Sequence, residues 1–389
     1  METEKLYYAD PFLTDFTATV LDCQPGKNGY LVTLDRTAFY PEGGGQPADH
    51  GVLDGAAVTD VHEKNGVILH NVDRAVEIGK TVTGAIDWER RFDHMQQHSG
   101  EHICSGLICQ RFHCDNVGFH MGADIVTIDF NADISWEELL EIEAKANQYL
   151  YENHPIDIQF HRGAELEAID YRSKKALEGD VRIVAFPGAD CCACCGTHVL
   201  RSGQVGLVKF LSVQKFREGV RIELLCGKRA LEYLSKTWEQ AKAIGQRLSV
   251  KPVDSEAAVE RLEGELTSLK LRCTQLEESV FESIAKELAG KGDVMLFQPS
   301  MRPDSVRRLM DAVSKTCSGL AAVFSGEEGH YAYALGRADG QDISPLVKAM
   351  NTALHGRGGG RNGFAQGSVE VERSAIESFF KENGYGICD

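Results

Sequence analysis

The chain has 389 residues, of which 43% are hydrophobic and 8% aromatic, and it carries a formal net charge of −17. This length exceeds that of one ordinary domain, so two or three folded domains with sizeable cores are expected. The acidic balance argues against a protein that coats nucleic acid non-specifically, because phosphate contacts need clustered Lys and Arg. Any nucleic-acid partner must therefore meet local basic patches.

The sequence shows no targeting or membrane segment. No apolar run approaches the roughly eighteen residues of a membrane span, and the first residues do not resemble a signal peptide. We therefore expect a cytoplasmic protein with no membrane contact, whose twelve cysteines are reduced thiols. In that compartment clustered cysteines indicate a metal more often than a disulfide. The scattered Cys23, Cys226, Cys273 and Cys317 are expected to be small core residues.

Residues 1–90 alternate apolar and polar side chains in short runs separated by Gly, Asp and Asn. This pattern predicts a small β-barrel or strongly curved sheet, with a glycine-rich loop at 41–51. Residues 91–230 combine two helices with several strands, which predicts an α+β fold rather than a doubly wound one. The helices are expected near 94–111 and 136–153, and the strands near 156–160, 181–186, 205–213 and 220–225.

Residues 231–290 are predicted to be helical, with one helix near 229–248 and a longer one after Pro252. Apolar residues in the longer helix recur at alternating spacings of three and four: Val259, Leu262, Leu266, Leu269, Cys273, Leu276 and Val280. This seam fits an antiparallel helical hairpin and a dimerising coiled coil equally well. Residues 291–389 alternate strands and helices, and we expect them to form an independent α/β domain.

Two pairs of potential metal ligands share the same spacing. His98 and His102 lie four residues apart, so on a helix both imidazoles face one ion. Cys194 and His198 add a thiolate and a third imidazole at the same separation. Thiolate with imidazole is a donor set that suits zinc, so we predict one zinc ion held by these four residues.

Neighbouring residues leave the ligand set and the role of the metal open. His94 and His113 are rival ligands, and His94 is more easily explained as a supporting or surface residue. Four protein ligands are typical of a structural zinc, whereas a catalytic zinc keeps one position for water or substrate. Glu101 can orient a ligand or a water, although a solvated helix position is the simpler hypothesis. Three nearby thiols can replace Cys194 or respond to oxidation, namely Cys191, Cys192 and Cys195.

Three motifs in order carry a resemblance to a known family. They are Pro41-Glu-Gly-Gly-Gly-Gln-Pro-Ala-Asp49, His98-x3-His102 and Cys194-Cys-Gly-Thr-His198-Val. Together they resemble the editing domain of alanyl-tRNA synthetases and, more closely, the free-standing alanyl-tRNA editing proteins of the AlaX type. The segment Gly356-Arg-Gly-Gly-Gly-Arg361 is similar to the DHH-associated domain that ends those synthetases, which favours the long form of the family. No aminoacylation domain, and hence no charging activity, is expected.

The resemblance implies zinc-dependent hydrolysis of the ester that joins a wrong amino acid, mainly serine and sometimes glycine, to tRNA(Ala). A second hydrolytic sieve is useful because a binding pocket separates such similar side chains only about 10–200-fold. The resemblance also makes the four predicted ligands the zinc ligands of the family. It places a residue that senses the serine hydroxyl between Asn116 and Thr127, and Thr127 is our candidate. Cys195 departs from the glycine that is usual in the synthetases.

Two glycine-rich segments have both a substrate-binding and a purely structural interpretation. In the first segment, the glycines at 43–45 either let the backbone approach the substrate closely or only form a turn. We favour the site role for Gly43, Gly44, Gly45, Gln46 and Asp49, with Gln46 and Glu101 as catalytic candidates. In the second segment, Arg357 and Arg361 flank glycines that either form a nest that binds tRNA phosphate or are only a flexible surface loop. Further basic side chains either complete a patch or are only solvated: Lys209, Lys215, Arg217, Arg221, Lys228 and Arg229.

These observations divide the chain into a barrel-like domain (1–90), a zinc-binding editing domain (91–230), a helical hairpin or coiled coil (231–290) and a C-terminal domain (291–389). A homodimer through residues 231–389 is compatible with the seam. A DHH phosphoesterase is disfavoured because the sequence has no Asp-His-His motif. The alternative to an editing enzyme is a non-catalytic tRNA-binding cofactor with a structural zinc.

Overall fold

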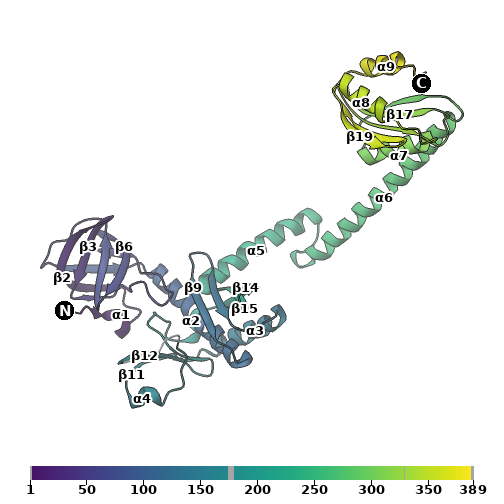
Figure 1. Ribbon diagram of the computed structural model, residues 1–389. Helices are drawn as coiled ribbons and strands as arrows, with labels where there is room; N and C mark the ends of the chain where they lie inside the picture. Colours follow the sequence, from purple (N-terminus) through teal and green to yellow (C-terminus); the bar gives the residue numbers. More distant parts are fainter. Residues whose placement is uncertain (1, 174–178, 328, 387–389) are drawn as a thin grey trace. The chain divides into compact units, whose positions relative to one another are not determined.

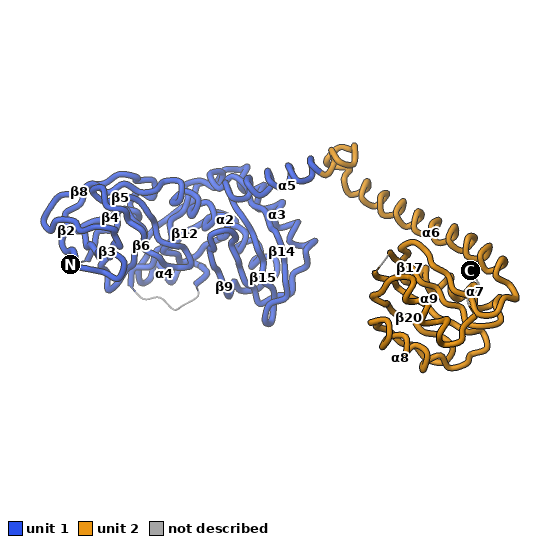
Figure 2. The backbone as a smooth tube through the Cα atoms, turned by 90° about the horizontal axis from the view of Figure 1, so that it is seen from above, with its two compact units in different colours: residues 1–243 blue, residues 244–389 orange. Residues whose placement is uncertain are grey.

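The computed structural model describes residues 2–173, 179–327 and 329–386 (Figure 1). It divides into two compact units, residues 1–243 and 244–389, which Figure 2 distinguishes by colour. The combination of helices with mainly antiparallel sheets confirms the predicted α+β class. Within these described ranges, no helix is long and apolar enough to cross a membrane.

The first unit begins with a closed barrel of six strands, each antiparallel to its neighbours, in the order β2-β3-β7-β6-β5-β8. Side chains alternate between the two faces of each strand, and the inward ones, such as Val32, Leu34 and Val61, form an apolar core. The strands are β2 (Asp15–Gly26), β3 (Gly29–Leu34), β5 (Gly51–Leu53), β6 (Ala56–Lys64), β7 (Val67–Val72) and β8 (Thr81–Ile86). A parallel pair, β1 (Glu4–Lys5) with β4 (Arg36–Thr37), and the helical turn α1 (Leu6–Ala9) complete this part.

Helix α2 (Trp88–Phe112) is central to the rest of the first unit. Asp87 caps it by accepting a hydrogen bond from the backbone N–H of Arg90, so the helix begins before the predicted residue 94. The helix shares one apolar core with α3 (Trp136–Glu152) and with a four-stranded antiparallel sheet in the order β14-β15-β10-β9. Those strands are β9 (Asn116–Met121), β10 (Val126–Phe130), β14 (Val208–Phe216) and β15 (Gly219–Cys226).

A three-stranded antiparallel sheet, β11-β12-β13, lies against α2 at one edge. Gly106 permits this approach, because a Cβ there would lie 2.1 Å from the carbonyl oxygen of Ala189. The elements are β11 (Asp157–His161), α4 (Ala164–Glu167), β12 (Val181–Phe186) and β13 (Asp190–Ala193). A 3-10 turn, η1 (Ser202–Val205), occupies the start of the predicted strand at 205–213, so β14 begins only at Val208.

Two long helices follow, α5 (Gly227–Leu248) and α6 (Ser255–Glu287), separated by the 3-10 turn η2 (Pro252–Asp254). The predicted seam lies on α6, and its members remain exposed, from 41% for Val259 to 61% for Leu269. Cys273 is also exposed, so the expectation that it is a core residue is wrong. Cys226 and Cys317 are buried, and Cys23 is half-buried against the barrel core.

The second unit contains a five-stranded sheet in the order β16-β17-β18-β20-β19, with only the first pair parallel. Its elements are β16 (Val294–Gln298), α7 (Pro303–Ser314), β17 (Leu320–Glu327), β18 (His330–Arg337), α8 (Ser344–Ala353), β19 (Arg357–Arg361), β20 (Phe364–Val369) and α9 (Arg373–Glu382). The glycine-rich segment at 357–361 was expected to be a loop or a nest. It is instead an edge strand paired with β20, which extends its backbone.

Candidate metal centre

The four predicted ligands converge on one point. Helix α2 presents His98 and His102 one turn apart, and the segment after β13 presents Cys194 and His198. One ligand atom from each lies within 4.8 Å of all the others. The Cys194 Sγ is 3.5 Å from His98 Nε2 and 3.3 Å from His198 Nε2. Residues that are about a hundred positions apart in the sequence therefore form one compact group.

Gly196 allows the ligand segment to pass directly over the first histidine. A Cβ at this position would lie 2.1 Å from His98 Cε1 and 2.9 Å from Gln46 Oε1. Any larger residue would displace that imidazole. The Gly196 backbone N–H also donates to Cys194 Sγ at 3.3 Å, which favours the thiolate form of this cysteine.

All three imidazoles have a hydrogen-bond partner at Nδ1. His98 Nδ1 lies 2.8 Å from Gln46 Oε1, and His102 Nδ1 lies 2.8 Å from Asp190 Oδ2. His198 Nδ1 lies 3.2 Å from Ser99 Oγ. An imidazole held in this way keeps its Nε2 for a metal, and such partners fix both the tautomer and the ring orientation. The described donor set therefore fits a zinc ion.

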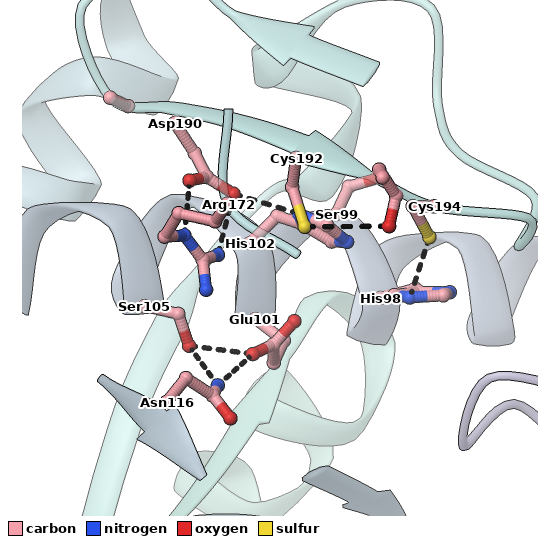
Figure 3. Close-up of polar contacts among 12 residues, drawn as sticks. His98, Ser99, Glu101, His102, Ser105, Asn116, Arg172, Asp190, Cys192 and Cys194 are labelled. Carbon is pink, nitrogen blue, oxygen red and sulfur yellow. Dashed lines mark hydrogen bonds and ion pairs between the residues drawn. The ribbon is translucent and has the colours of Figure 1, made fainter. Parts of the chain in front are cut away.

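Charges around the group favour the ionised forms of the Cys194 thiol and the Asp190 carboxyl. Burial alone raises the pKa of the Cys194 thiol, but the three imidazoles beside it bring that pKa well below its ordinary value. Burial also raises the pKa of Asp190, and hydrogen bonds from His102 and Arg172 outweigh it, so the carboxyl stays ionised. Arg172 donates to both Asp190 oxygens at 2.7 Å (Figure 3). Asp190 is a supporting residue that the sequence analysis missed.

The glycine-rich loop is a tight hairpin turn that delivers Gln46 to the centre. Gly43 and Gln46 exchange backbone hydrogen bonds of 3.1 and 3.0 Å. Between them Gly44 and Gly45 have φ of +61° and +86°, a geometry that favours glycine at both positions. The buried Gln46 side chain donates to Thr197 Oγ1 at 2.8 Å and accepts from the Thr197 N–H at 3.1 Å. Gln46 thus connects the barrel to both ligand-bearing segments.

Asp49, predicted to bind substrate, is instead enclosed in the protein interior. Its carboxylate forms a fully buried ion pair with Arg91 of α2 and accepts from the Tyr40 N–H at 2.6 Å. The same guanidinium also donates to two backbone carbonyls, those of Pro11 and Ala38. Asp49 therefore holds the barrel loop on α2, and the substrate-binding assignment is wrong.

Glu101 lies beside the centre but is not one of the grouped ligands. It is 4% exposed, so the hypothesis of a solvated helix position is wrong. Its Oε1 accepts from Ser105 Oγ at 2.6 Å and from Asn116 Nδ2 at 2.8 Å, as Figure 3 shows. These bonds hold the carboxylate away from the histidines, so we describe Glu101 as part of a polar network next to the centre.

Thr127 lies on the wrong face of its sheet to sense a substrate at the centre. Its neighbours Val126 and Ile128 point into the apolar core, so Thr127 points away from it. Its partner across the strand pair is His120, whereas the adjacent Phe119 stacks on His98 with ring centroids 5.2 Å apart. The structure therefore does not bring Thr127 to the predicted ligands.

The structure also does not bring the rival ligands His94 and His113 into the group of four predicted ligands. His113 is exposed after the end of α2. His94 is 2% exposed, and burial, followed by the charges of Arg90 and Arg229, lowers its pKa to about 3. Cys192 forms a second group with His102 and Asp190, whose ligand atoms also lie within 4.8 Å of one another. Cys191 is half-buried and Cys195 is exposed, and neither belongs to the groups found in the described residues.

Most of the predicted basic patch in the first unit is neutralised. Five of its six members pair with carboxylates: Lys209 with Glu143, Lys215 with Asp133, Arg221 with Asp129, Lys228 with Glu89 and Arg229 with Asp93. In the second unit, Arg357 and Arg361 are exposed on β19. They form no ion pair among the described residues. A cavity of about 360 Å³ lies between α8 and β19, lined by Ser344, Lys348, Asn351 and Gly358 among others.

The chain matches three family models in sequence order. They describe tRNA synthetases class II (A) over residues 3–90, the threonyl and alanyl tRNA synthetase second additional domain over 181–223, and the DHHA1 domain over 287–382. The alanyl-tRNA editing protein AlaX-L of Pyrococcus horikoshii is 30% identical, with 96% of each chain covered. The alanine–tRNA ligase of Pyrococcus abyssi is 32% identical over 98% of this chain, and that of Natronomonas pharaonis is 34% identical over 94% of this chain. The chain spans 44% and 42%, respectively, of the length of these two ligases. Because the similarity to AlaX-L extends over almost the whole of both proteins, the chain belongs to the family of AlaX-L alanyl-tRNA editing proteins.

Proposed function

We propose that this protein hydrolyses the ester bond of mischarged tRNA(Ala), mainly Ser-tRNA(Ala) and also Gly-tRNA(Ala), and so releases the wrong amino acid. The observation that carries the proposal is the ligand group itself. Three buried imidazoles are each held at Nδ1, and one ligand atom of each lies within 4.8 Å of the Cys194 sulfur. The names of the relatives supply the substrate class, because they are alanyl-tRNA editing proteins and alanine–tRNA ligases.

Each residue around the centre has a distinct role in this proposal. His98, His102, Cys194 and His198 hold one zinc ion. When bound, zinc polarises the ester carbonyl or makes a water more acidic. Gln46 keeps the His98 ring in the orientation needed for binding. The N–H groups of the exposed Gly44 and Gly45 have no acceptor in the described part of the chain, so they are available to hydrogen-bond the aminoacyl end.

The second unit supplies most of the tRNA affinity in this proposal. Arg357 and Arg361 are exposed cations that can pair with phosphates of the RNA backbone. We also propose that the exposed seam of α6 joins two copies of the chain, because apolar side chains at alternating three- and four-residue spacing bury one another in a helix pair.

Deacylation assays with Ser-, Gly- and Ala-tRNA(Ala) test the enzymatic proposal. We expect the zinc-loaded protein to hydrolyse the first two and to spare the third. Removal of the metal with a chelator, or Cys194→Ala, should abolish activity, while Cys195→Ala, at the exposed neighbouring cysteine, should retain it. If zinc-loaded protein binds tRNA but hydrolyses none of the three substrates, the non-catalytic cofactor is correct. Undiminished hydrolysis by Cys194→Ala would exclude the zinc mechanism.

A further inference from the structure

An exposed aromatic side chain lies close to the ligand segment. Phe160 on β11 is 53% exposed, and its ring centroid is 5.7 Å from that of Tyr8 on α1, at an interplanar angle of 72°. Tyr8 in turn packs edge-to-face on Tyr7, 4.6 Å away. Phe160 therefore packs against aromatic rings on one side, while about half of its own surface stays open to solvent.

Arg182 connects this aromatic pair to the metal centre. It lies directly opposite Phe160 in the β11–β12 register, so both side chains are on the same face of the sheet. Its guanidinium lies 5.0 Å from the centroid of the Tyr8 ring. Its Nη1 donates to the carbonyl oxygens of Cys194 and Gly196 at 2.8 and 2.9 Å. One buried side chain thus contacts Tyr8 and the segment that carries two of the ligands.

No carboxylate among the described residues pairs with Arg182. The residue is 5% exposed and forms no ion pair among the residues described, and its buried Nε has no hydrogen-bond partner there. A buried guanidinium without a counter-ion is unfavourable, and its positive potential attracts an anion. An aromatic ring open to solvent beside such a charge is the combination that binds single-stranded nucleic acid, through base stacking and attraction of the backbone.

We infer that Phe160, supported by Tyr8 and Arg182, forms a nucleotide subsite in which the base of the RNA 3′-terminal nucleotide stacks on the Phe160 ring. This inference rests on the proposed function, because the scissile ester is then carried by the ribose of that same nucleotide. Stacking there would place the ester toward the ligand segment, because Arg182, the cross-strand partner of Phe160, donates to the carbonyl oxygens of Cys194 and Gly196. Phe160 is accordingly a positioning residue that acts on substrate binding and not on the chemical step.

Steady-state kinetics on the zinc-loaded, full-length protein with Ser-tRNA(Ala) test the subsite. Loss of one base–aromatic stack should raise KM in Phe160→Ala by about 5–150-fold and leave kcat within about threefold. Phe160→Trp should restore KM, because it retains a stacking surface. Val117→Ala is the matched control, since Val117 is an exposed apolar strand residue of β9 with 54% exposure. An unchanged KM in Phe160→Ala overturns the inference, as does a loss that falls entirely on kcat.

A second readout does not depend on hydrolysis. A tRNA(Ala) that ends in a photoreactive 8-azidoadenosine is cross-linked to the protein, and the labelled peptide is identified by mass spectrometry. Labelling of the peptides that contain Phe160 or Tyr8, reduced in Phe160→Ala, supports the subsite even if the wild type shows no deacylation. Labelling confined to other peptides refutes it even if deacylation is efficient, so the subsite and the proposed function fail separately.

Discussion

Asp190→Asn provides a direct test of how the metal centre is held. The Asp190 carboxylate accepts from His102 Nδ1 at 2.8 Å and from Arg172 at 2.7 Å on each oxygen. An asparagine can keep the bond to His102 through its one oxygen, but its NH₂ group then faces the N–H of Arg172, donor against donor. The negative charge that favours the correct tautomer of His102 is lost as well. Such changes weaken metal binding by about 10–100-fold, or about 1.4–2.8 kcal/mol.

The assay is a competition for zinc between the full-length protein and a chromophoric chelator at neutral pH, with circular dichroism to verify folding. Asp180→Asn is the matched control, because it makes the same chemical change in the Arg162–Asp180 pair, whose side chains are 74% and 51% exposed. Exposed pairs contribute little, so the control should bind zinc like the wild type. If folded Asp190→Asn binds zinc within twofold of the wild type, Asp190 does not orient the ligand and the reasoning fails.

Three further predictions concern other parts of the chain. Burial lowers the pKa of His70 to about 4, so the unfolded state takes up the proton first as the pH falls below about 6.5. The wild type should therefore lose free energy of unfolding between pH 7 and pH 5, and urea unfolding should show that His70→Gln removes about 2 kcal/mol of that loss. Equal losses in the two proteins would contradict this. Gly196→Ala should abolish zinc binding by displacing the His98 ring, whereas Gly264→Ala, where a Cβ meets nothing within 4 Å, should leave it intact. Leu266→Asp should convert a dimer to a monomer in sedimentation; a monomeric wild type would exclude the dimerising seam.

The ligand positions were predictable because local geometry determines them. Two histidines four residues apart on a helix share a face whatever the rest of the fold, and the Cys194–His198 segment repeats that spacing around a glycine. The supporting residues were harder to identify. Gln46 was named only through the family resemblance, and Asp190 was missed although a carboxylate four residues before Cys194 was visible in the sequence. Their roles depend on contacts such as Gln46 Oε1 with His98, which no local pattern encodes.

Three predictions from the sequence, for Thr127, Asp49 and residues 357–361, differ from the structure for physical reasons. Thr127 alternates with Val126 and Ile128, and that period of two was a signal that its hydroxyl faces away from the core. Asp49 was assigned by its place in a motif, but a buried carboxylate needs a partner, and Arg91 lies 42 positions later in the sequence. The glycine-rich segment at 357–361 forms a strand because β20 supplies hydrogen-bond partners, so tertiary pairing overrides the local preference of glycine for turns.

The three Nδ1 partners come from three different parts of the first unit, and this has a consequence for stability. Gln46 belongs to the barrel, Ser99 to α2 and Asp190 to β13, so the imidazoles are oriented only when all three parts are packed together. A metal that binds only this folded arrangement stabilises it by mass action. Zinc at the centre would therefore strengthen the association of the barrel with α2, in addition to any part it takes in hydrolysis. The choice between a structural and a catalytic metal is then not exclusive, because the same four ligands connect the folding of the first unit to the chemistry proposed for it.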